Sequence, residues 1–283
     1  MKFKNILILL ICLFFNCIFY GEKINASSLK TAFKKSIVIL KGQGSDASGV
    51  IIGKKSNNYY ILTVKHFLSE LKDDYDVELP SGNLSKLKII KIFADYDLAI
   101  GKFQSKEQFF TLPINKFLPY PAPYTPETFQ YDYLKLRSEF DTVKTVARVG
   151  GFSIPTNAVK LRLFRVIDAS LVALVKNNID GYNLLYQAST VPGMSGGAVV
   201  GFRDCTMDRG GFTLTISPAL NFPSLVGIHG RSEDYHGEGR SGISLGIPIE
   251  GQIKDFLISK KTEYGIPYGE TEIRDIVNKQ YCL

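Results

Sequence analysis

Histidine and cysteine are both scarce in this sequence. Its 283 residues contain three histidines and four cysteines, and no set of them has the spacing of a metal site. We therefore expect no metal ion and no cofactor.

Basic residues are not concentrated in any part of the sequence either. The formal net charge is +7, without the dense lysine and arginine stripe that nucleic-acid binding requires. We expect no nucleic-acid partner.

The N-terminal segment has the pattern of an export signal. Two lysines precede an apolar stretch at 6–20, and Ala26 closes a segment that resembles a small-residue cleavage site. We expect a signal peptide at 1–26 and a periplasmic or secreted protein. An uncleaved membrane anchor is the alternative, although the stretch is shorter than the ~20 residues of a spanning helix and Asn16 interrupts it.

Loss of this segment would leave only two cysteines. Cys12 and Cys17 lie within it, whereas Cys205 and Cys282 remain. Two cysteines can pair in an oxidising compartment, but the sequence does not show whether their Cα atoms come close enough. The pairing of Cys205 with Cys282 therefore stays open. The shortened chain is mildly basic.

Short β-rich runs separated by turn residues dominate the chain from Ser36 onward, as in an all-β sandwich or barrel. They form two groups of similar size around a stretch rich in Pro, Tyr and charge. We expect an N-terminal β unit at 27–116, a linker strap at 117–143 and a second β unit at 144–261. The runs are SIVIL (36–40), SGVIIG (48–53), YYILTV (59–64), LKIIKIF (87–93), VARVGGF (146–152), KLRLFRVI (160–167), YNLLYQAS (182–189), GGAVVGF (196–202), GFTLTIS (211–217), SLVGIHG (224–230) and ISLGIPI (243–249).

The periodicity changes after Pro248. Ile249, Ile253, Phe256 and Leu257 recur at helical spacing and can form one apolar face. We expect a C-terminal helix that packs on the second β unit. The charged tail at 262–283 gives no structural prediction, and no internal repeat of about 20 to 50 residues is evident.

A serine stands in a glycine cluster at 191–200, VPGMSGGAVV. Because glycine tolerates backbone angles that other residues do not, the cluster allows a tight turn and a close approach to Ser195. A glycine-rich hairpin turn is the simpler interpretation. A reactive serine would also need a base, usually histidine, and a third group that orients the base.

Two residues of the N-terminal unit meet that need. His66 ends the β-like run YYILTVKH, where its ring can face a cleft, although a structural histidine is the other interpretation. Asp97 directly precedes an apolar run at 98–100, where a carboxylate can be partly buried. Asp95 is the rival, because alternate residues of a strand point the same way. With Ser195 in the second unit, the three residues predict a cleft between two barrels.

Together these segments resemble the trypsin-like serine endopeptidases, in the bacterial secreted branch that includes the glutamyl endopeptidases and the periplasmic heat-stress proteases. The matching pieces are SGVIIG with ILTVKH, then DYDLAI, GMSGGAV and LVGIHG, in the family's order over 48–249. The resemblance implies two antiparallel β-barrels of the trypsin-like type with a C-terminal helix. It also implies peptide-bond hydrolysis in a polypeptide substrate. Ser195 would be the nucleophile, His66 the general base and Asp97 its orienter, and the N–H groups of Gly193 and Ser195 would form the oxyanion hole.

The same resemblance bears on specificity. His229 is similar to a histidine of the glutamyl endopeptidases that binds the substrate carboxylate, and Thr190 matches a hydroxyl that assists it; Ser232 can shape the same wall. A preference for Glu or Asp before the cut follows. The alternative is that His229 lines a general apolar pocket. No acidic residue occupies 189–194, so a preference for Arg or Lys is unsupported.

Met194 departs from the pattern of the zymogen-activated animal members, which carry an aspartate directly before the serine. Because methionine cannot pair with a new N-terminal ammonium, we expect a site that is competent once the protein is exported. Because only about twenty residues follow the predicted helix in this sequence and a domain generally needs ~50 or more, we expect no appended peptide-binding domain. The alternative function is a catalytically silent double barrel that acts as a binding module. Nothing in the sequence indicates an oligomeric state.

Overall fold

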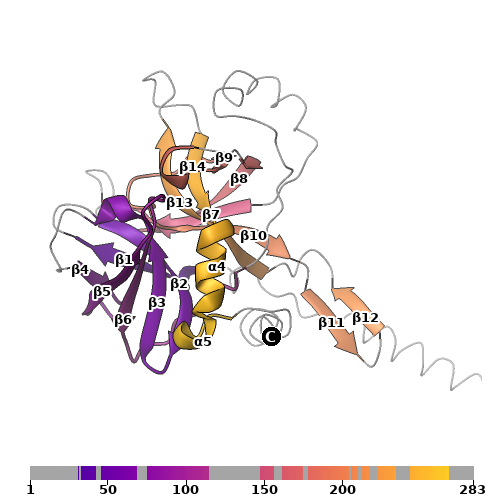
Figure 1. Cartoon of the computed structure of the whole chain (residues 1–283), viewed down its shortest axis with the longest axis horizontal. Helices are drawn as coiled ribbons and strands as arrows, with labels where there is room; N and C mark the ends of the chain where they lie inside the picture. The colour runs from indigo at the N-terminus through magenta and orange to yellow at the C-terminus, as the bar shows by residue number, and fades with distance from the viewer. Residues whose placement is uncertain are drawn as a thin grey trace, which may run out of the picture.

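In the described part of the chain, most strands belong to two closed β-barrels of six strands each (Figure 1). The computed structural model describes residues 31, 33–42, 46–68, 75–114, 147–155, 161–174, 178–203, 205–209, 212–216, 222–233 and 243–267. The first barrel comprises β1 (Ile37–Lys41), β2 (Asp46–Lys55), β3 (Asn58–Thr63), β4 (Tyr75–Glu78), β5 (Leu84–Ile92) and β6 (Ala99–Gln104). The second comprises β7 (Ala147–Phe152), β8 (Phe164–Leu174), β9 (Leu184–Gln187), β10 (Ala198–Arg203), β13 (Phe222–Glu233) and β14 (Ile243–Pro248). The predicted double-barrel fold is confirmed.

Strands pair antiparallel around the first barrel in the order β1-β2-β3-β6-β5-β4. The side chains of β2 and β3 are almost all buried, which explains why their sequences read as continuous apolar runs. In β4, buried Tyr75 and Val77 alternate with half-buried Asp76 and Glu78. That alternation extends over only four residues, and the sequence analysis did not predict this strand.

The second barrel has the strand order β10-β13-β14-β9-β8-β7. Between β10 and β13 the chain forms a separate two-stranded sheet of β11 (Cys205–Arg209) and β12 (Phe212–Ile216), which projects away from the barrels in Figure 1. The run at 211–217 therefore belongs to this sheet and not to the barrel. β11 was not predicted.

The larger of two hydrophobic core clusters contains buried residues of both barrels, and the smaller one lies within the second barrel. The segment after β6 joins them. The Leu112 N–H donates to Ile51 O in β2 at 3.0 Å, and the Leu225 N–H in β13 donates to Pro113 O at 2.8 Å. This crossing segment fixes the first barrel against the second.

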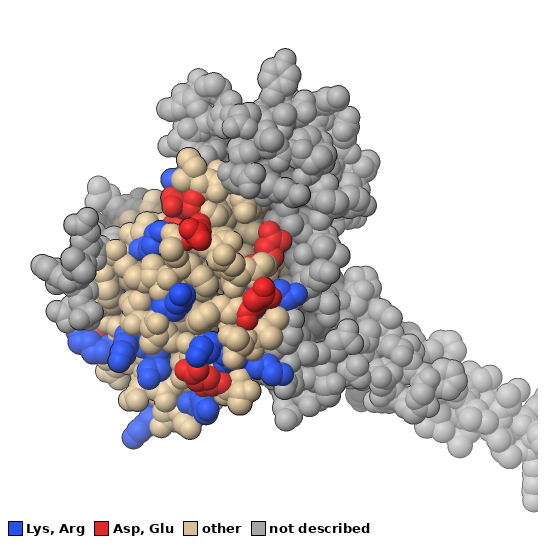
Figure 2. All heavy atoms as spheres, viewed as in Figure 1, with Lys and Arg blue, Asp and Glu red and all other residues tan. Residues whose placement is uncertain are grey.

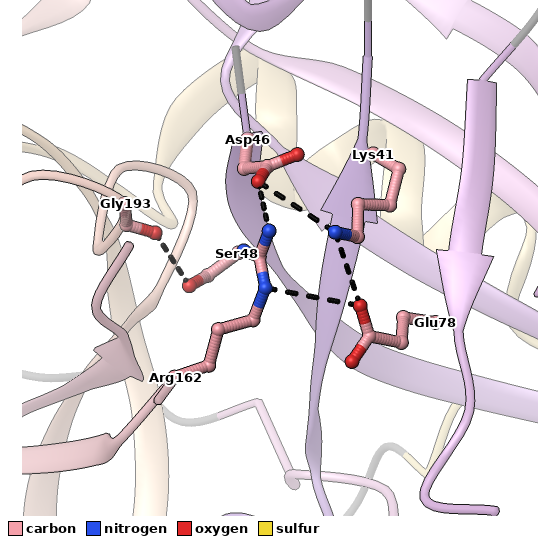
Figure 3. A network of polar contacts seen from close by, with 6 residues as sticks. All are labelled: Lys41, Asp46, Ser48, Glu78, Arg162 and Gly193. Atoms are coloured by element: carbon pink, nitrogen blue, oxygen red, sulfur yellow. Dashed lines mark hydrogen bonds and ion pairs between the residues drawn. The ribbon is translucent and has the colours of Figure 1, made fainter. Parts of the chain in front are cut away.

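An ion-pair network also connects the barrels (Figure 3). Arg162, just before β8, pairs with Asp46 of β2 and lies with its Nε 3.8 Å from Glu78 Oε2 of β4. Lys41 of β1 completes the network, at 3.2 Å from Glu78 and 3.8 Å from Asp46. The Arg162 side chain is only 16% exposed, so this network is better shielded from solvent than an ordinary surface ion pair.

The C-terminal helix lies where its periodicity places it, but its packing prediction was wrong. The chain forms α4 (Gly251–Ser259) and a short helix α5 (Lys261–Tyr264), which pack on the first barrel. Phe256 meets Phe93 edge to face, with ring centroids 5.6 Å apart, and Tyr264 stacks on Tyr60 at 4.3 Å. These aromatic partners belong to the first barrel, whereas the second contributes the backbone contact that precedes the helix, from the Ile249 N–H to Val226 O.

Several sequence predictions lie outside the described residues. They are the signal peptide at 1–26, the linker strap at 117–143, Cys282 and the side chain of Cys205. Within the described part of the chain, no helix is long and apolar enough to cross a membrane. On the face in Figure 2, Lys and Arg side chains are interspersed with acidic ones.

Candidate active site

The glycines around Ser195 are required by crowding. Gly196 has a φ of +81°, and a Cβ there would lie 2.0 Å from Ser48 O and 2.5 Å from Thr63 Oγ1. Gly193 has a φ of +91°, and a Cβ there would lie 2.7 Å from Phe152 O. Both positions combine a left-handed backbone with no space for a side chain. The tight turn predicted from the sequence is confirmed, with Ser195 half-buried at its centre.

Main-chain hydrogen bonds tie this turn to both barrels. The Ser48 N–H in β2 donates to Ser195 O at 2.8 Å. On the other side, the Gly196 N–H donates to His229 O at 2.7 Å and the His229 N–H donates to Gly197 O at 2.8 Å. Ser195 therefore lies between a strand of the first barrel and β13 of the second.

Ser48 holds the turn in a second way. Its hydroxyl donates to Gly193 O at 2.9 Å (Figure 3) and accepts the Phe152 N–H at 2.9 Å. The side chain is fully buried. Ser48 was part of a matching motif, but the sequence analysis gave it no role of its own, because its partners are more than a hundred residues away in the chain.

His66 and Asp97 form a pair at the edge of the first barrel. His66 lies in the single turn η1 (Lys65–Phe67), just after β3, and Asp97 precedes β6. The His66 Nδ1 is hydrogen-bonded to Asp97 Oδ2, and the His66 N–H donates to Asp97 Oδ1 at 2.6 Å. Asp97 is buried, whereas Asp95 is exposed. The structure thus favours Asp97 over Asp95 as the partner of His66.

The second barrel reaches Asp97 through the loop between β8 and β9, which contains the single turn η2 (Ile179–Gly181). The Asp97 N–H donates to Asp180 O at 2.8 Å, and the Tyr182 hydroxyl donates to Asp97 Oδ2. Burial alone would raise the pKa of Asp97, but hydrogen bonds from His66 and Tyr182 outweigh it and hold that pKa below its usual value. Asp97 is therefore a buried carboxylate that stays ionised at neutral pH.

His66 and Ser195 come from opposite sides of this region. Among the described residues no hydrogen bond joins the Ser195 hydroxyl to His66. His229 of β13 bonds the serine turn through its backbone N–H and C=O groups. Burial first, and the charge of His66 second, lower the pKa of His229 to about 3. In the described part of the chain, neither the Gly193 N–H nor the Ser195 N–H donates a hydrogen bond.

The three predicted substrate-binding residues fall into two groups. Thr190 and Ser232 meet at 2.5 Å between hydroxyl oxygens, and Thr190 also contacts the hydroxyl of Ser244 at 3.0 Å. His229 instead bonds through Nδ1 to the Tyr186 hydroxyl at 2.6 Å, with both side chains buried. Ser244 and Tyr186 were missed, because only the pairing of β14 with β9 and β13 brings them here.

The described residues contain no group of His, Cys, Asp and Glu side chains that could hold a metal ion. The site thus consists of a histidine bonded to a buried carboxylate, a half-buried serine on a constrained turn, and a neighbouring set of hydroxyl groups. Such an arrangement suits nucleophilic catalysis by an activated serine.

Comparison with known proteins identifies the fold. Two similar solved structures are both of the HtrA-type protease AlgW with a tripeptide, one of them carrying a serine-to-alanine substitution. The TM-scores are 0.52 and 0.51, with 18% and 16% sequence identity. Each match covers 86% of this chain and 65% of the other, so this chain spans less than two thirds of their length. No protein-family model and no curated protein matches the sequence. The likeness establishes the double-barrel fold of the trypsin-like serine proteases.

Proposed function

We propose that this protein is a serine endopeptidase that hydrolyses peptide bonds through an acyl-enzyme at Ser195. The observation that carries the proposal is the buried, ionised Asp97 bonded to His66, beside a serine turn held by both barrels. Because Asp97 accepts the proton on Nδ1, the Nε2 of His66 is free to act as a base. No cofactor or metal is needed for this chemistry.

The reaction would proceed in two halves. The Ser195 oxygen bonds to the substrate carbonyl carbon while its proton passes to His66; His66 then gives the proton to the leaving nitrogen as the C–N bond breaks. In the second half His66 takes a proton from water, whose oxygen attacks the acyl carbon, and gives it to the Ser195 oxygen as the bond between that oxygen and the acyl carbon breaks, which releases the carboxylic acid. The N–H groups of Gly193 and Ser195 would stabilise the oxyanion of both intermediates, and each such donor is worth about 10² to 10³ in rate.

We further propose that the enzyme prefers Glu or Asp before the cut. The hydroxyls of Thr190, Ser232 and Ser244 offer polar partners for a carboxylate, which is costly to bury alone. A Tyr186 hydroxyl that donates to Nδ1 would leave the proton of neutral His229 on Nε2, where it can donate to the substrate. Replacing His229 with Ala should then reduce cleavage after Glu far more than cleavage after Leu or Phe. Equal losses would exclude this preference.

The proposed activity is tested with a serine-directed fluorophosphonate on the purified protein, with the modified residue mapped by mass spectrometry. We expect labelling at Ser195 that His66→Ala abolishes, and peptide cleavage that is lost in the same variant. A folded protein that is neither labelled nor active would refute the proposal and favour a binding module on the same fold.

We also propose export to the periplasm or the medium, with cleavage after Ala26. The support is the pattern of lysines, apolar residues and small residues at 1–26. Intact-mass measurement of the exported protein tests it. A mass that retains residues 1–26 would instead indicate a membrane-anchored protease.

A further inference from the structure

We infer that Tyr182 is a positioning residue of this site. Its hydroxyl binds the Asp97 carboxylate from the second barrel and thereby influences the proton affinity of His66. The inference rests on the proposed function, because it gives Tyr182 a part in the Asp97–His66 pair. It concerns a residue that no motif of the sequence indicated.

The contacts of the carboxylate show why Tyr182 matters. Asp97 Oδ1 accepts the His66 N–H, whereas Oδ2 is shared between His66 Nδ1 and the Tyr182 hydroxyl. Among the described donors to this carboxylate, Tyr182 is the one that comes from the second barrel. The Tyr182 hydroxyl and the His66 imidazole bond to the same oxygen, Oδ2. The bond from Tyr182 therefore weakens the interaction by which the Asp97 charge orients and stabilises His66.

The neighbours of Tyr182 leave space for its ring and hold it in place. Gly230 of β13 lies against it so closely that a Cβ there would be 2.0 Å from Tyr182 Cε1. Asn178 secures the backbone, since its side-chain amide donates to Tyr182 O at 2.8 Å. The Arg231 guanidinium covers the ring at 4.8 Å from the centroid. The ring is buried, and these neighbours in β13 and at the start of η2 leave it little freedom to turn away from Asp97.

The charged groups around the pair support a neutral, donating phenol. Burial first, and then the hydrogen bond to Asp97 and its charge, raise the pKa of Tyr182 well above its ordinary value, while Arg231 opposes this and Asp180 adds to it. His229 of β13, whose pKa burial and the charge of His66 lower to about 3, is itself neutral at physiological pH. The Tyr182 hydroxyl therefore stays protonated and donates to Asp97 at neutral and mildly alkaline pH.

Removing this donor has a defined physical result. In Tyr182→Phe the charge on Asp97 is no longer shared with the phenol, so it stabilises a protonated His66 more strongly. His66 should then lose its proton at higher pH, and the less firmly held carboxylate should orient the imidazole less well. Loss of a hydrogen bond to a buried charge changes an equilibrium constant or a rate by about ten- to hundred-fold. We expect the loss of kcat/KM to lie within this range.

The test combines a titration that needs no turnover with kinetics. Because the chain has only three histidines, the His66 signals can be followed by NMR and assigned with His66→Ala. We expect the His66 titration midpoint to move to higher pH in Tyr182→Phe. We also expect kcat/KM to fall about ten- to hundred-fold, chiefly through kcat, with the acidic limb of its pH profile displaced in the same direction.

Tyr59→Phe is the matched control. Tyr59 is equally buried and donates to Glu107 O at 2.8 Å, within the first barrel. Its loss should lower stability without moving the His66 titration. An unmoved or lowered midpoint in Tyr182→Phe, or the same shift in Tyr59→Phe, overturns the inference. Failure of the proposed function is distinct, because it appears as absent labelling of the wild-type protein.

Gly230→Ala provides an independent check from the opposite side. The new methyl group would displace the Tyr182 ring, so this variant should move the His66 midpoint in the same direction as Tyr182→Phe. Combining the two changes should move it no further, since the hydroxyl is already lost. Additive shifts in the double variant would show that Gly230 acts by another route and would refute the role given to its missing side chain.

Discussion

The hydroxyl of Ser48 should support both stability and turnover. In Ser48→Ala, Gly193 O loses a donor and the Phe152 N–H loses its acceptor. An unsatisfied buried group costs about 1–3 kcal/mol. Because Gly193 and Phe152 are both half-buried, water can partly replace the lost bonds. We therefore expect the free energy of unfolding to fall by about 2 kcal/mol in total.

The effect on the reaction should follow from the same bonds. Gly193 is the proposed oxyanion donor, and its peptide is held in place by the Ser48 hydroxyl. A displaced donor forfeits part of the 10² to 10³ in rate that one such group supplies, so kcat should fall at least about tenfold with KM little changed. Peptide hydrolysis kinetics and urea unfolding measure the two effects on one preparation.

Ser224→Ala is the matched comparison for this prediction. Ser224 is 1% exposed, like the fully buried Ser48, but its hydroxyl has no hydrogen-bond partner among the described residues. Its replacement should leave kcat unchanged and should not destabilise the protein. The reasoning about Ser48 fails if both variants unfold at the same urea concentration, or if Ser48→Ala keeps the wild-type kcat.

Three further variants test other parts of the structure. Burial lowers the pKa of His229 from 6.5 to about 3. The neutral side chain therefore contributes to the free energy of unfolding above pH 6.5, and this contribution is lost as the pH falls towards 3. In His229→Gln, the free energy of unfolding measured with urea should depend less on pH between these two values. Gly196→Ala should abolish turnover and greatly reduce stability, whereas Gly82→Ala, with a φ of +86° but open space around it, should cost about 1–2 kcal/mol and leave turnover intact; similar losses in both would contradict the crowding at the serine turn. Arg162→Ala should lower the unfolding free energy by about 1–2 kcal/mol, more than Lys41→Ala, and this difference should shrink in high salt.

The strands that the sequence predicted are those whose apolar content is dense. β2 and β3 are buried almost throughout, so their pattern is visible without any partner. β4 has only two buried side chains among its four residues, and its place is set by pairing with β1 and β5. The helical periodicity after Pro248 correctly predicted α4, but it held no information about which barrel supplies the aromatic partners.

Within the site, local motifs identified His66, Asp97 and Ser195, because a glycine cluster and residues at strand ends leave a signal in a few consecutive positions. Their catalytic roles stay predictions. Only the tertiary structure decided between Asp95 and Asp97, since burial depends on the surrounding fold and not on strand alternation. It alone also brought Tyr182 onto Asp97 and Ser48 onto Gly193. These contacts join residues 85 and 145 positions apart, and a linear pattern cannot encode such pairs because they form only when two barrels close against each other.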